Sequence, residues 1–569
     1  MCGIIGITSK DVFTSKELLT RLKRLEYRGY DSWGYWNGVR LEKQTGKIII
    51  SDDEQETKRA ISHTRWATHG GVNKKNAHPH RAGKVTIVHN GIIENWKELK
   101  KKLQETGAEF SSETDSEVIA HFVNQGLNGG KGMEQILPEL IAAIRGTFAT
   151  LIMVDGDEHL YAARRDSPLA LGICPARIII GSDIYAFSDA TDKALFFDND
   201  EYAIITPGSY RFFKNGEEIG KETKTFDWEN VGEDKQEYEH FMLKEIHEAP
   251  TVCRRLIDSL EAEQRDRFTE LVAMIRKAKK TVFTAAGTAY HASLLGASFL
   301  HQCGVEAQAI IASEFENFIT VDEETLVIAV SQSGETMDVI ESLKYGKEHG
   351  ARIASIVNVP YSSIERMSEL SLQILAGQEV AVASTKAFTN QCAVMLALAQ
   401  AFGYQNGLDE LPKKLSGVLA FEPELERLAG ELSKKHDLYV LGRKLGYPVA
   451  REIALKIKEV SYIHAEGMMG GELKHGTIAL IEQGMPVVSL VYDDDPKMRS
   501  STQEVKARGA HVVVIGTTAD DDIRIPARSE AKFAILAATI GQLLAYHIAK
   551  HRKLPIDKPR NLAKSVTVL

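Results

Sequence analysis

The second half of this chain repeats its own pattern, and this repeat restricts the possible folds more than any other feature. The apolar run Thr281–Ala285 leads through a glycine turn into a helical stretch, and Asp437–Leu441 does the same. A second pair of runs, Leu326–Val330 and Val487–Val491, keeps nearly the same offset, so equivalent positions lie 155 to 161 residues apart. Short, wholly apolar strands that alternate with longer amphipathic helices are typical of parallel sheets. We therefore predict two doubly wound α/β subdomains, which bind ligands at the carboxyl ends of their strands.

The first half has a different pattern, in which short β-type runs alternate with helical stretches, as in a layered α/β domain. The predicted strands are Gly3–Thr8, Lys47–Ser51, Lys84–His89, Ala149–Val154, His159–Arg164 and Ala203–Thr206. The predicted helices are Ser15–Leu25, Trp96–Thr106, Ser116–Asn124 and Met133–Ile144.

A turn-rich, charged stretch between the two halves, residues 207–236, indicates a domain boundary. We expect a layered domain over residues 2–218 and a linker over 219–238. Two doubly wound subdomains should follow over 239–425 and 426–556, and a terminal tail over 557–569.

Composition excludes several classes of protein. The 569 residues carry 69 basic and 78 acidic side chains, a net charge of −9, and no basic block, so we expect no nucleic-acid partner. The five cysteines are widely scattered, which indicates neither a disulfide framework nor a zinc site. Charges appear early, at Lys10 and Asp11, and no apolar run reaches ~18 residues. We therefore expect a soluble, cytoplasmic protein without a membrane span.

The chain begins Met1-Cys2, followed by the glycine-punctuated run Gly3–Gly6. Removal of Met1 would leave a cysteine with a free α-amine, whose pKa of about 7.7–8 lies close to the thiol pKa of about 8.5. The amine can then take the thiol proton, as in other N-terminal nucleophiles. Read alone, a cysteine at position 2 is more often incidental.

Three polar islands follow: Arg65–Gly70, His89–Gly91 and Glu113–Ser116. Each has an ordinary interpretation, namely packing, a hairpin turn, and a helix cap by Thr114 or Asp115. Together they also supply what amide hydrolysis needs. Arg65 can pair with a substrate carboxylate, Asp115 can bind an α-ammonium, and Asn90 with the Gly91 N–H can stabilise an oxyanion.

Five histidines lie between His63 and His89, but no cysteine or glutamate falls at ligand spacing around them, so we expect no metal site. With Cys2–Gly6 and the segment Leu25–Ser32, the islands resemble the glutaminase domain of amidotransferases that have an N-terminal cysteine nucleophile. Trp33 stands where that family has a small residue, and its indole would crowd the glutamine pocket. The resemblance implies that glutamine is bound by Arg65, Trp66, Thr68, His69, Gly91 and Asp115.

In the first repeat, Ser331-Gln332-Ser333-Gly334-Glu335-Thr336 follows a predicted strand and precedes a predicted helix. Hydroxyls and backbone N–H groups at a helix start bind anions, and without the lysine of a nucleotide loop they suit one phosphate on a small molecule. A well-capped helix is the ordinary alternative. Ala383–Lys386 offers a second polar helix start. The hexapeptide in its repeated setting resembles the sugar-isomerase domains that bind phosphosugars.

The second repeat carries titratable groups instead. Glu452, Lys456 and Glu459 have the spacing of one helical face, which ordinarily forms a solvated row of salt bridges. A loop then places His475 among glycines, and the chain ends in the segment 557–569, which by composition alone would be a frayed tail.

The whole set, from Cys2 to the tail, resembles the isomerising glutamine–fructose-6-phosphate aminotransferases. This resemblance implies L-glutamine and fructose 6-phosphate as substrates, no cofactor, no metal and at least a homodimer. It implies that Cys2 releases ammonia with Asn90 and Gly91 at the oxyanion, and that Trp66 gates an internal channel. His475 of a neighbouring subunit would open the sugar ring, Lys564 would form a Schiff base, and Lys456 and Glu459 would move protons. The sugar phosphate would contact Thr288, Ser331, Gln332, Ser333, Thr336, Val382, Ser384 and Lys564.

Two segments depart from the family pattern: Ala289 replaces a serine after Ala286-Gly287-Thr288, and Gly467-Met468-Met469 precedes the histidine loop. Three alternative functions fit the sequence less well. Another cysteine-dependent amidotransferase would need a nucleotide or phosphoribosyl-diphosphate loop, which is not seen in the sequence. A phosphosugar sensor would not need Lys456, Glu459, His475 and Lys564 together. A deaminase would not use the glutaminase-like first domain.

Overall fold

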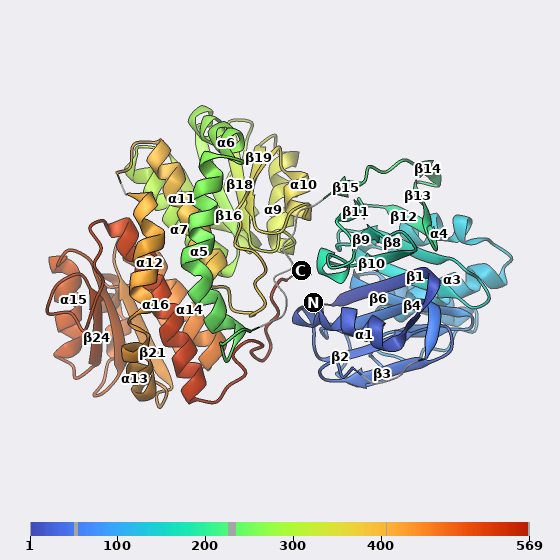
Figure 1. The fold of residues 1–569 in the computed structure, drawn as a ribbon, viewed down its shortest axis with the longest axis horizontal. Coiled ribbons are helices and arrows are strands. Elements are labelled where there is room, and N and C mark those ends of the chain that lie inside the picture. Colours follow the sequence, from blue (N-terminus) through green and yellow to red (C-terminus); the bar gives the residue numbers. More distant parts are fainter. Residues whose placement is uncertain (1, 51–54, 226–234, 406, 567–569) are drawn as a thin grey trace. The chain divides into compact units, whose positions relative to one another are not determined.

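The computed structural model describes residues 2–50, 55–225, 235–405 and 407–566 (Figure 1). The chain divides into two compact units, one formed by Met1–Asn230 with Ser565–Leu569 and the other by Val231–Lys564. The change of unit near residue 230 falls inside the predicted linker 219–238. The finer boundaries at 218, 425 and 556 stay a prediction.

The first unit is built on two antiparallel sheets. The larger has the strand order β15-β11-β9-β10-β1-β4-β2-β3, and the smaller has the order β14-β13-β12-β8-β7-β6-β5. The strands of the larger sheet are β1 (Gly3–Thr14), β2 (Ser32–Trp36), β3 (Leu41–Thr45), β4 (Glu56–Arg65), β9 (Ala170–Ile173), β10 (Arg177–Gly181), β11 (Lys193–Phe196) and β15 (Lys224–Thr225). Those of the smaller are β5 (His80–Ala82), β6 (Val85–Ile93), β7 (Gly146–Val154), β8 (Leu160–Arg165), β12 (Glu201–Thr206), β13 (Ser209–Lys214) and β14 (Glu217–Ile219).

The two sheets pack face to face between layers of helices. Apolar side chains such as Ile4, Ile61, Val88 and Leu151 form the core between the sheets. A second core lies between the smaller sheet and its helices, and α1 packs on β1 and β4 of the larger sheet. The helices are α1 (Ser15–Lys23), α2 (Trp96–Glu105), α3 (Glu117–Asn128) and α4 (Met133–Ala143). The predicted layered α/β domain is therefore confirmed, and its first strand starts directly after Cys2.

Two local predictions in this unit are wrong. Residues 47–50 form no strand, because the Ile48 N–H donates to Glu26 Oε1 at 2.6 Å instead of joining a ladder. Neither Thr114 nor Asp115 caps α3, whose N-cap position is Ser116. Strand β15 also pairs with β11, so the larger sheet extends past residue 218 into the predicted linker.

The second unit contains two parallel five-stranded sheets. The first has the order β17-β16-β18-β19-β20 and the second the order β22-β21-β23-β24-β25, so the arrangement of one sheet repeats that of the other. The first contains β16 (Lys280–Ala285), β17 (Ala307–Ile311), β18 (Thr325–Ser331), β19 (Arg352–Val357) and β20 (Leu370–Gln373). The second contains β21 (Asp437–Gly442), β22 (His464–Met469), β23 (Pro486–Val491), β24 (His511–Gly516) and β25 (Ile523–Arg524).

Helices cover both faces of each sheet, as in a doubly wound fold. In the second subdomain, Figure 1 shows α15 outside the sheet, and α14 and α16 on the side that faces the rest of the unit. The helices of the unit are α5 (Phe241–Glu261), α6 (Arg265–Lys277), α7 (Gly287–Gln302), α8 (Phe315–Phe318), α9 (Met337–Glu348), α10 (Ser363–Met367), α11 (Lys386–Ala401), α12 (Leu411–Leu419), α13 (Glu422–Leu432), α14 (Gly446–Ser461), α15 (Pro496–Lys506) and α16 (Glu530–His551). The predicted pair of doubly wound subdomains is confirmed.

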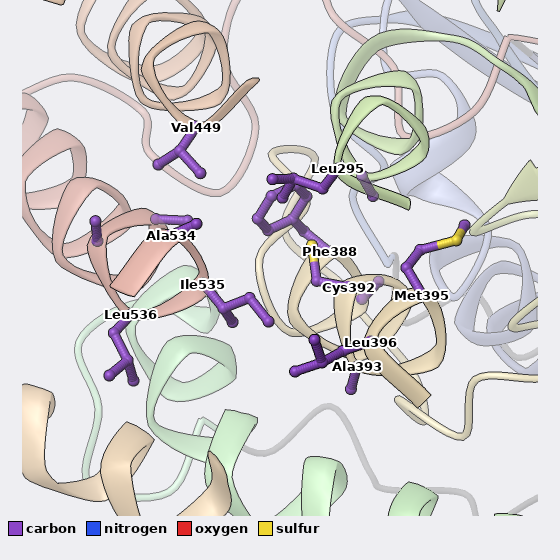
Figure 2. Close-up of a cluster of buried hydrophobic side chains, with 14 of the residues drawn as sticks. Leu295, Phe388, Cys392, Ala393, Met395, Leu396, Val449, Ala534, Ile535 and Leu536 are labelled. Atoms are coloured by element: carbon purple, nitrogen blue, oxygen red, sulfur yellow. The ribbon is translucent and has the colours of Figure 1, made fainter. Parts of the chain in front are cut away.

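The two subdomains share one hydrophobic core. Figure 2 shows Leu295 of α7, Phe388 and Cys392 of α11, Val449 of α14 and Ile535 of α16 around this core. Helix α16 is long and apolar enough to cross a membrane, but the whole of its apolar window is buried inside the protein. Its composition is therefore explained by its place in the shared core.

Candidate active site

Cys2 lies at the start of β1, where three other segments hold it. The Trp66 N–H donates to Cys2 Sγ at 3.3 Å, and the thiol faces the Trp66 carbonyl at 3.6 Å. The Cys2 carbonyl accepts from Asn90 Nδ2 at 2.9 Å and from Arg28 Nε at 3.3 Å. Arg28 is itself buried and paired with Asp183 at 2.9 Å. The sulfur is thus fixed beside the first two polar islands.

Burial raises the pKa of the Cys2 thiol, the positive charge of Arg65 opposes that rise, and Asp115 adds to it. The thiol therefore needs a base to form the thiolate. The expected base is the α-amine exposed by removal of Met1, which lies outside the described residues. This assignment stays a prediction.

Asn90 and Gly91 lie within β6, paired with Ala149 and Phe148 of β7. The alternative that Asn-Gly forms a hairpin turn is therefore wrong. Gly91 has φ +126°, and a Cβ built there would lie 2.1 Å from the Thr147 carbonyl oxygen. Only glycine fits this position of the strand.

The first polar island forms a loop that Arg65 stabilises. Its guanidinium donates to the carbonyls of His69, Gly70 and Gly71, and Ala67 N–H donates to Asp31 Oδ2 at 2.9 Å. Burial lowers the pKa of Arg65, and the charges of Cys2, Asp31 and Asp115 oppose that shift. The structure thus uses Arg65 to hold the loop that presents the Trp66 N–H to Cys2.

The other predicted glutamine-binding residues lie around this loop. The Trp66 ring packs edge-on against Tyr30 at 5.8 Å, and His69 against Trp96 at 6.4 Å, while Thr68 is exposed. Trp33, which differs from the small residue of the family pattern, is buried in β2. Its indole N–H donates to the Lys47 carbonyl at 3.0 Å. That hydrogen bond directs the indole N–H toward the turn after β3.

Asp115 is buried, and one of its oxygens, Oδ2, accepts the Ile93 N–H at 2.8 Å. Its other oxygen faces the Ser116 hydroxyl at 3.4 Å. Its charge acts on Cys2, Arg65 and His89. The structure therefore brings together the predicted groups for the two ends of an amino acid and the nucleophile.

Four buried histidines support the same region. His63 stacks on His78 at 4.0 Å, and His78 meets His80 at 4.4 Å. His89 Nδ1 lies 2.8 Å from the Ser116 hydroxyl. Burial lowers the pKa of all four, to about 3 for His63, so they are neutral near pH 7.

In the second unit, the predicted phosphate loop joins the end of β18 to α9. The Ser331 hydroxyl accepts the Gly334 N–H at 3.0 Å and lies 3.1 Å from the Thr336 hydroxyl. The Ser333 hydroxyl accepts the Glu335 N–H at 3.2 Å, and the Gln332 carbonyl accepts the Asn358 N–H at 3.3 Å. Hydroxyls and backbone N–H groups at the start of α9 are the kind of donor that an anion needs.

A second cluster joins the two repeats. Lys456 lies 2.5 Å from Glu459 and 3.5 Å from Glu452, and it donates to the Thr288 hydroxyl at 2.9 Å. His291 Nδ1 contacts the other oxygen of Glu452 at 2.7 Å. Burial opposes the charge of Lys456, but Glu459 and Glu452 raise its pKa. Glu452 and Lys456 are buried and Glu459 is partly buried, so the alternative of a solvated salt-bridge row is wrong.

A third cluster contains the predicted Schiff-base lysine. Lys564 Nζ lies 2.5 Å from Glu379 Oε2 and 2.8 Å from the Ala381 carbonyl, and its side chain is only 3% exposed. The Ser384 hydroxyl donates to the same Glu379 oxygen at 2.9 Å. The neighbouring Val382 N–H donates to the Asp557 carbonyl at 3.0 Å. Lys564 is therefore docked, contrary to the alternative of a frayed tail.

His475 is not part of these clusters. It ends a short 3-10 segment, Glu472–His475, and is exposed. Its imidazole makes no hydrogen bond or ion pair with the described residues.

Sequence reasoning missed Glu379 and His291 as members of the site and treated Glu452 only as part of a helical face. Glu379 is a single acid in a loop, and its partner Lys564 is 185 residues away. The one usable signal was its place five residues before Ser384, at the start of α11.

The two units define an amidotransferase of the N-terminal-cysteine type joined to a pair of sugar-isomerase domains. Residues 1–206 match the family described as a glutamine amidotransferase domain, and residues 274–401 and 431–552 match the SIS domain. The chain belongs to the isomerising glutamine–fructose-6-phosphate aminotransferase family.

It is 40% identical to the enzyme of that name from Thermococcus kodakarensis and 38% identical to that of Sulfurisphaera tokodaii, over 100% of both chains in each case. The solved C-terminal domain of glucosamine-fructose-6-phosphate aminotransferase from Francisella tularensis is 34% identical, with a TM-score of 0.53. The match covers 57% of this chain and all of that one.

Proposed function

We propose that this chain converts L-glutamine and fructose 6-phosphate to L-glutamate and glucosamine 6-phosphate. The observation that carries the proposal is the pairing of two nucleophiles in one chain. Cys2 is a fixed thiol at the start of β1, and Lys564 is a buried amine beside the Ser384 hydroxyl. Membership of the family supports this reading.

In the glutaminase reaction, the Cys2 thiolate attacks the side-chain amide of glutamine and releases ammonia. The oxyanion forms near Asn90 and the Gly91 N–H, where fixed donors lower the barrier. Asp115 and Arg65 bind the two charged ends of the amino acid. Water then hydrolyses the thioester to glutamate, and the ammonia passes through a channel gated by Trp66.

In the isomerase reaction, the sugar phosphate binds at Ser331, Gln332, Ser333 and Thr336, with Thr288, Val382 and Ser384 alongside. Lys564 forms an iminium with C2 of the open-chain ketose. Glu459 moves a proton between C1 and C2, and Lys456 holds that carboxylate in place at 2.5 Å. No resident cofactor or metal is needed for these steps.

The proposal includes at least a homodimer in the cytoplasm. An exposed His475 is what a residue serving a neighbouring subunit's sugar site requires. Its imidazole would open the sugar ring of the partner's substrate.

The test is product analysis with glutamine and fructose 6-phosphate together and with each omitted. Glucosamine 6-phosphate should form only when both are present. Cys2→Ala should reduce the glutamine-dependent synthesis by roughly 10⁴-fold or more, because the nucleophile is lost. Reductive trapping of fructose 6-phosphate should continue in that variant. Cys174→Ala is the matched control and should keep both reactions, and full synthesis by Cys2→Ala would contradict the proposal.

A second test concerns Glu459. Glu459→Gln should reduce glucosamine 6-phosphate formation by about 10²–10⁴-fold, because a general base is removed. Glutamate release, measured separately, should persist. Glu466→Gln, at an exposed acid on the neighbouring strand β22, should change neither rate. Near-normal synthesis by Glu459→Gln would move the proton transfer to another group.

A further inference from the structure

The carboxylate of Glu379 is held in one orientation by the start of α11. Its Oε1 accepts the Thr385 N–H at 2.8 Å and the Ala387 N–H at 3.2 Å. Its Oε2 is thereby directed at Lys564 Nζ, 2.5 Å away, and at the Ser384 hydroxyl. The side chain of Glu379 is 0% exposed. Capping the helix would need only the Glu379 carboxylate. The structure also buries the Lys564 ammonium against it.

Several charged groups surround this contact. Burial opposes the charge of Glu379, but Lys564, Thr385 N–H and Lys386 together lower its pKa. The charge of Glu379 also acts on Lys456, so both lysines of the proposed isomerase reaction lie within its field. Glu245, from α5, is fully buried next to it and accepts the Val380 and Ala381 N–H groups through Oε1. The other oxygen of Glu245 has no hydrogen-bond partner among the described residues.

We propose that Glu379 is the acid–base partner of Lys564: its carboxylate receives the ammonium proton when the amine attacks the sugar ketone, and returns it to the hydroxyl that leaves. This inference rests on the Schiff base of the proposed function. It adds a catalytic residue that touches the reacting nitrogen.

The step balances in atoms and charge. The Lys564 ammonium gives one proton to the Glu379 carboxylate and becomes a neutral amine. The nitrogen lone pair forms the C–N bond to C2, the carbonyl π pair moves to oxygen, and a proton passes from nitrogen to that oxygen. The C–O bond then breaks, the proton of Glu379 leaves with the hydroxyl as water, and the iminium forms. The carboxylate is regenerated, and one positive charge is present before and after.

The neighbouring Glu245 is expected to be protonated while this happens. Burial and the charge of Glu379 raise its pKa to about 8. A neutral Glu245 leaves Glu379 as the carboxylate that faces the lysine near pH 7.

The experiment is reductive trapping in the full-length enzyme. Fructose 6-phosphate and cyanoborohydride are added at several pH values, and the sugar-modified peptide containing Lys564 is quantified over time. In the unchanged enzyme the rate should vary little with pH around neutrality, because the proton moves within the pair. Glu379→Gln should trap about 10²-fold more slowly or worse. Its rate should rise with pH, because the proton must leave to solvent.

Two variants separate acid–base chemistry from structural support. Glu379→Asp keeps a carboxylate and should recover part of the rate and the flat pH profile. Glu410→Gln removes the carboxylate that pairs with Lys532 elsewhere in the unit and should behave as the unchanged enzyme. Glutamate release by all variants shows whether the first unit is intact. Thermal unfolding shows whether the second unit is still folded.

The possible failures are distinguishable. Absence of trapping at Lys564 in the unchanged enzyme would overturn the proposed Schiff base, and this inference with it. If Lys564 is trapped in the unchanged enzyme, and Glu379→Gln has the same trapping rate and the same pH profile, only the role of Glu379 is overturned. Slow trapping with an unchanged pH profile in both Glu379 variants would reduce Glu379 to a residue that positions Lys564, which also overturns the proposal.

Discussion

Replacing Gly91 with alanine is expected to reduce glutamine hydrolysis by about 10²–10³-fold, the effect of losing one oxyanion donor. The added Cβ would lie 2.1 Å from the Thr147 oxygen, 2.6 Å from its carbonyl carbon and 2.9 Å from Phe148 Cα. These are backbone atoms of the buried strand β7, so β6 must move instead. The Gly91 N–H then leaves the position at which it faces the amide carbonyl. Glutamate release at saturating glutamine measures the loss, and trapping of fructose 6-phosphate at Lys564 should be unchanged.

The matched control is Gly156→Ala in the turn between β7 and β8. Gly156 also has a positive φ, +78°, but a Cβ there meets nothing within 4 Å. Alanine at this position should cost about 1 kcal/mol of stability from its backbone conformation and leave hydrolysis intact. Equal losses in the two variants would assign the effect to backbone strain and not to the displaced oxyanion donor.

Mild acid should unfold the first unit, because His63, His78, His80 and His89 are buried as neutral side chains. Their folded pKa values lie below the ordinary 6.5, at about 3 for His63, mainly because of burial. Below pH 6.5 the unfolded chain therefore binds protons that the folded chain does not. The stability is fully present above pH 6.5 and is lost as the pH falls toward the folded pKa values. Each such proton lowers the free energy of unfolding by about 1.4 kcal/mol per pH unit, or about 5 kcal/mol for four.

The measurement is chemical unfolding followed between about pH 6.5 and 5.5, where carboxylates with pKa values of about 3.9–4.3 stay mostly ionised. His63→Gln should reduce the slope of stability against pH by about one proton, since a glutamine amide can keep the bond to the His89 carbonyl. His464→Gln, at a side chain that is 75% exposed, should leave the slope unchanged. A flat profile in the unchanged enzyme would show that these histidines are not held neutral.

The repeat of the second unit could be predicted because parallel strands buried on both faces appear as continuous apolar runs between helices. The first unit is harder, since pairing partners decide its strands. β2 contains Trp33, Gly34 and Trp36 without clear alternation, and it is a strand because β3 and β4 pair with both of its edges. Residues 47–50 have strand propensity, but Glu26 takes the hydrogen bond that a neighbouring strand would have made.

The same distinction applies to the site. Cys2, Asn90, Gly91 and Asp115 stand in short motifs, so local sequence was enough to single them out. Glu379 could not be separated from other loop acids, because its role depends on a lysine supplied by the end of the chain. Lys456 was visible as part of a helical face. Only packing against Thr288 of the other repeat shows that this face is buried.

That contact has a consequence for how the fused chain can change. Thr288 and His291 come from one copy of the duplicated subdomain, whereas Glu452 and Lys456 come from the other. Under the proposed function, the two copies serve as complementary halves, one with the predicted anion loop and the other with the predicted proton carriers. Neither copy is self-sufficient, and covalent linkage fixes their ratio at one to one. Substitutions at this contact between α7 and α14 are therefore coupled: a change on α7 alters which residues α14 can tolerate. The coupling holds although the two helices are more than a hundred residues apart in the sequence.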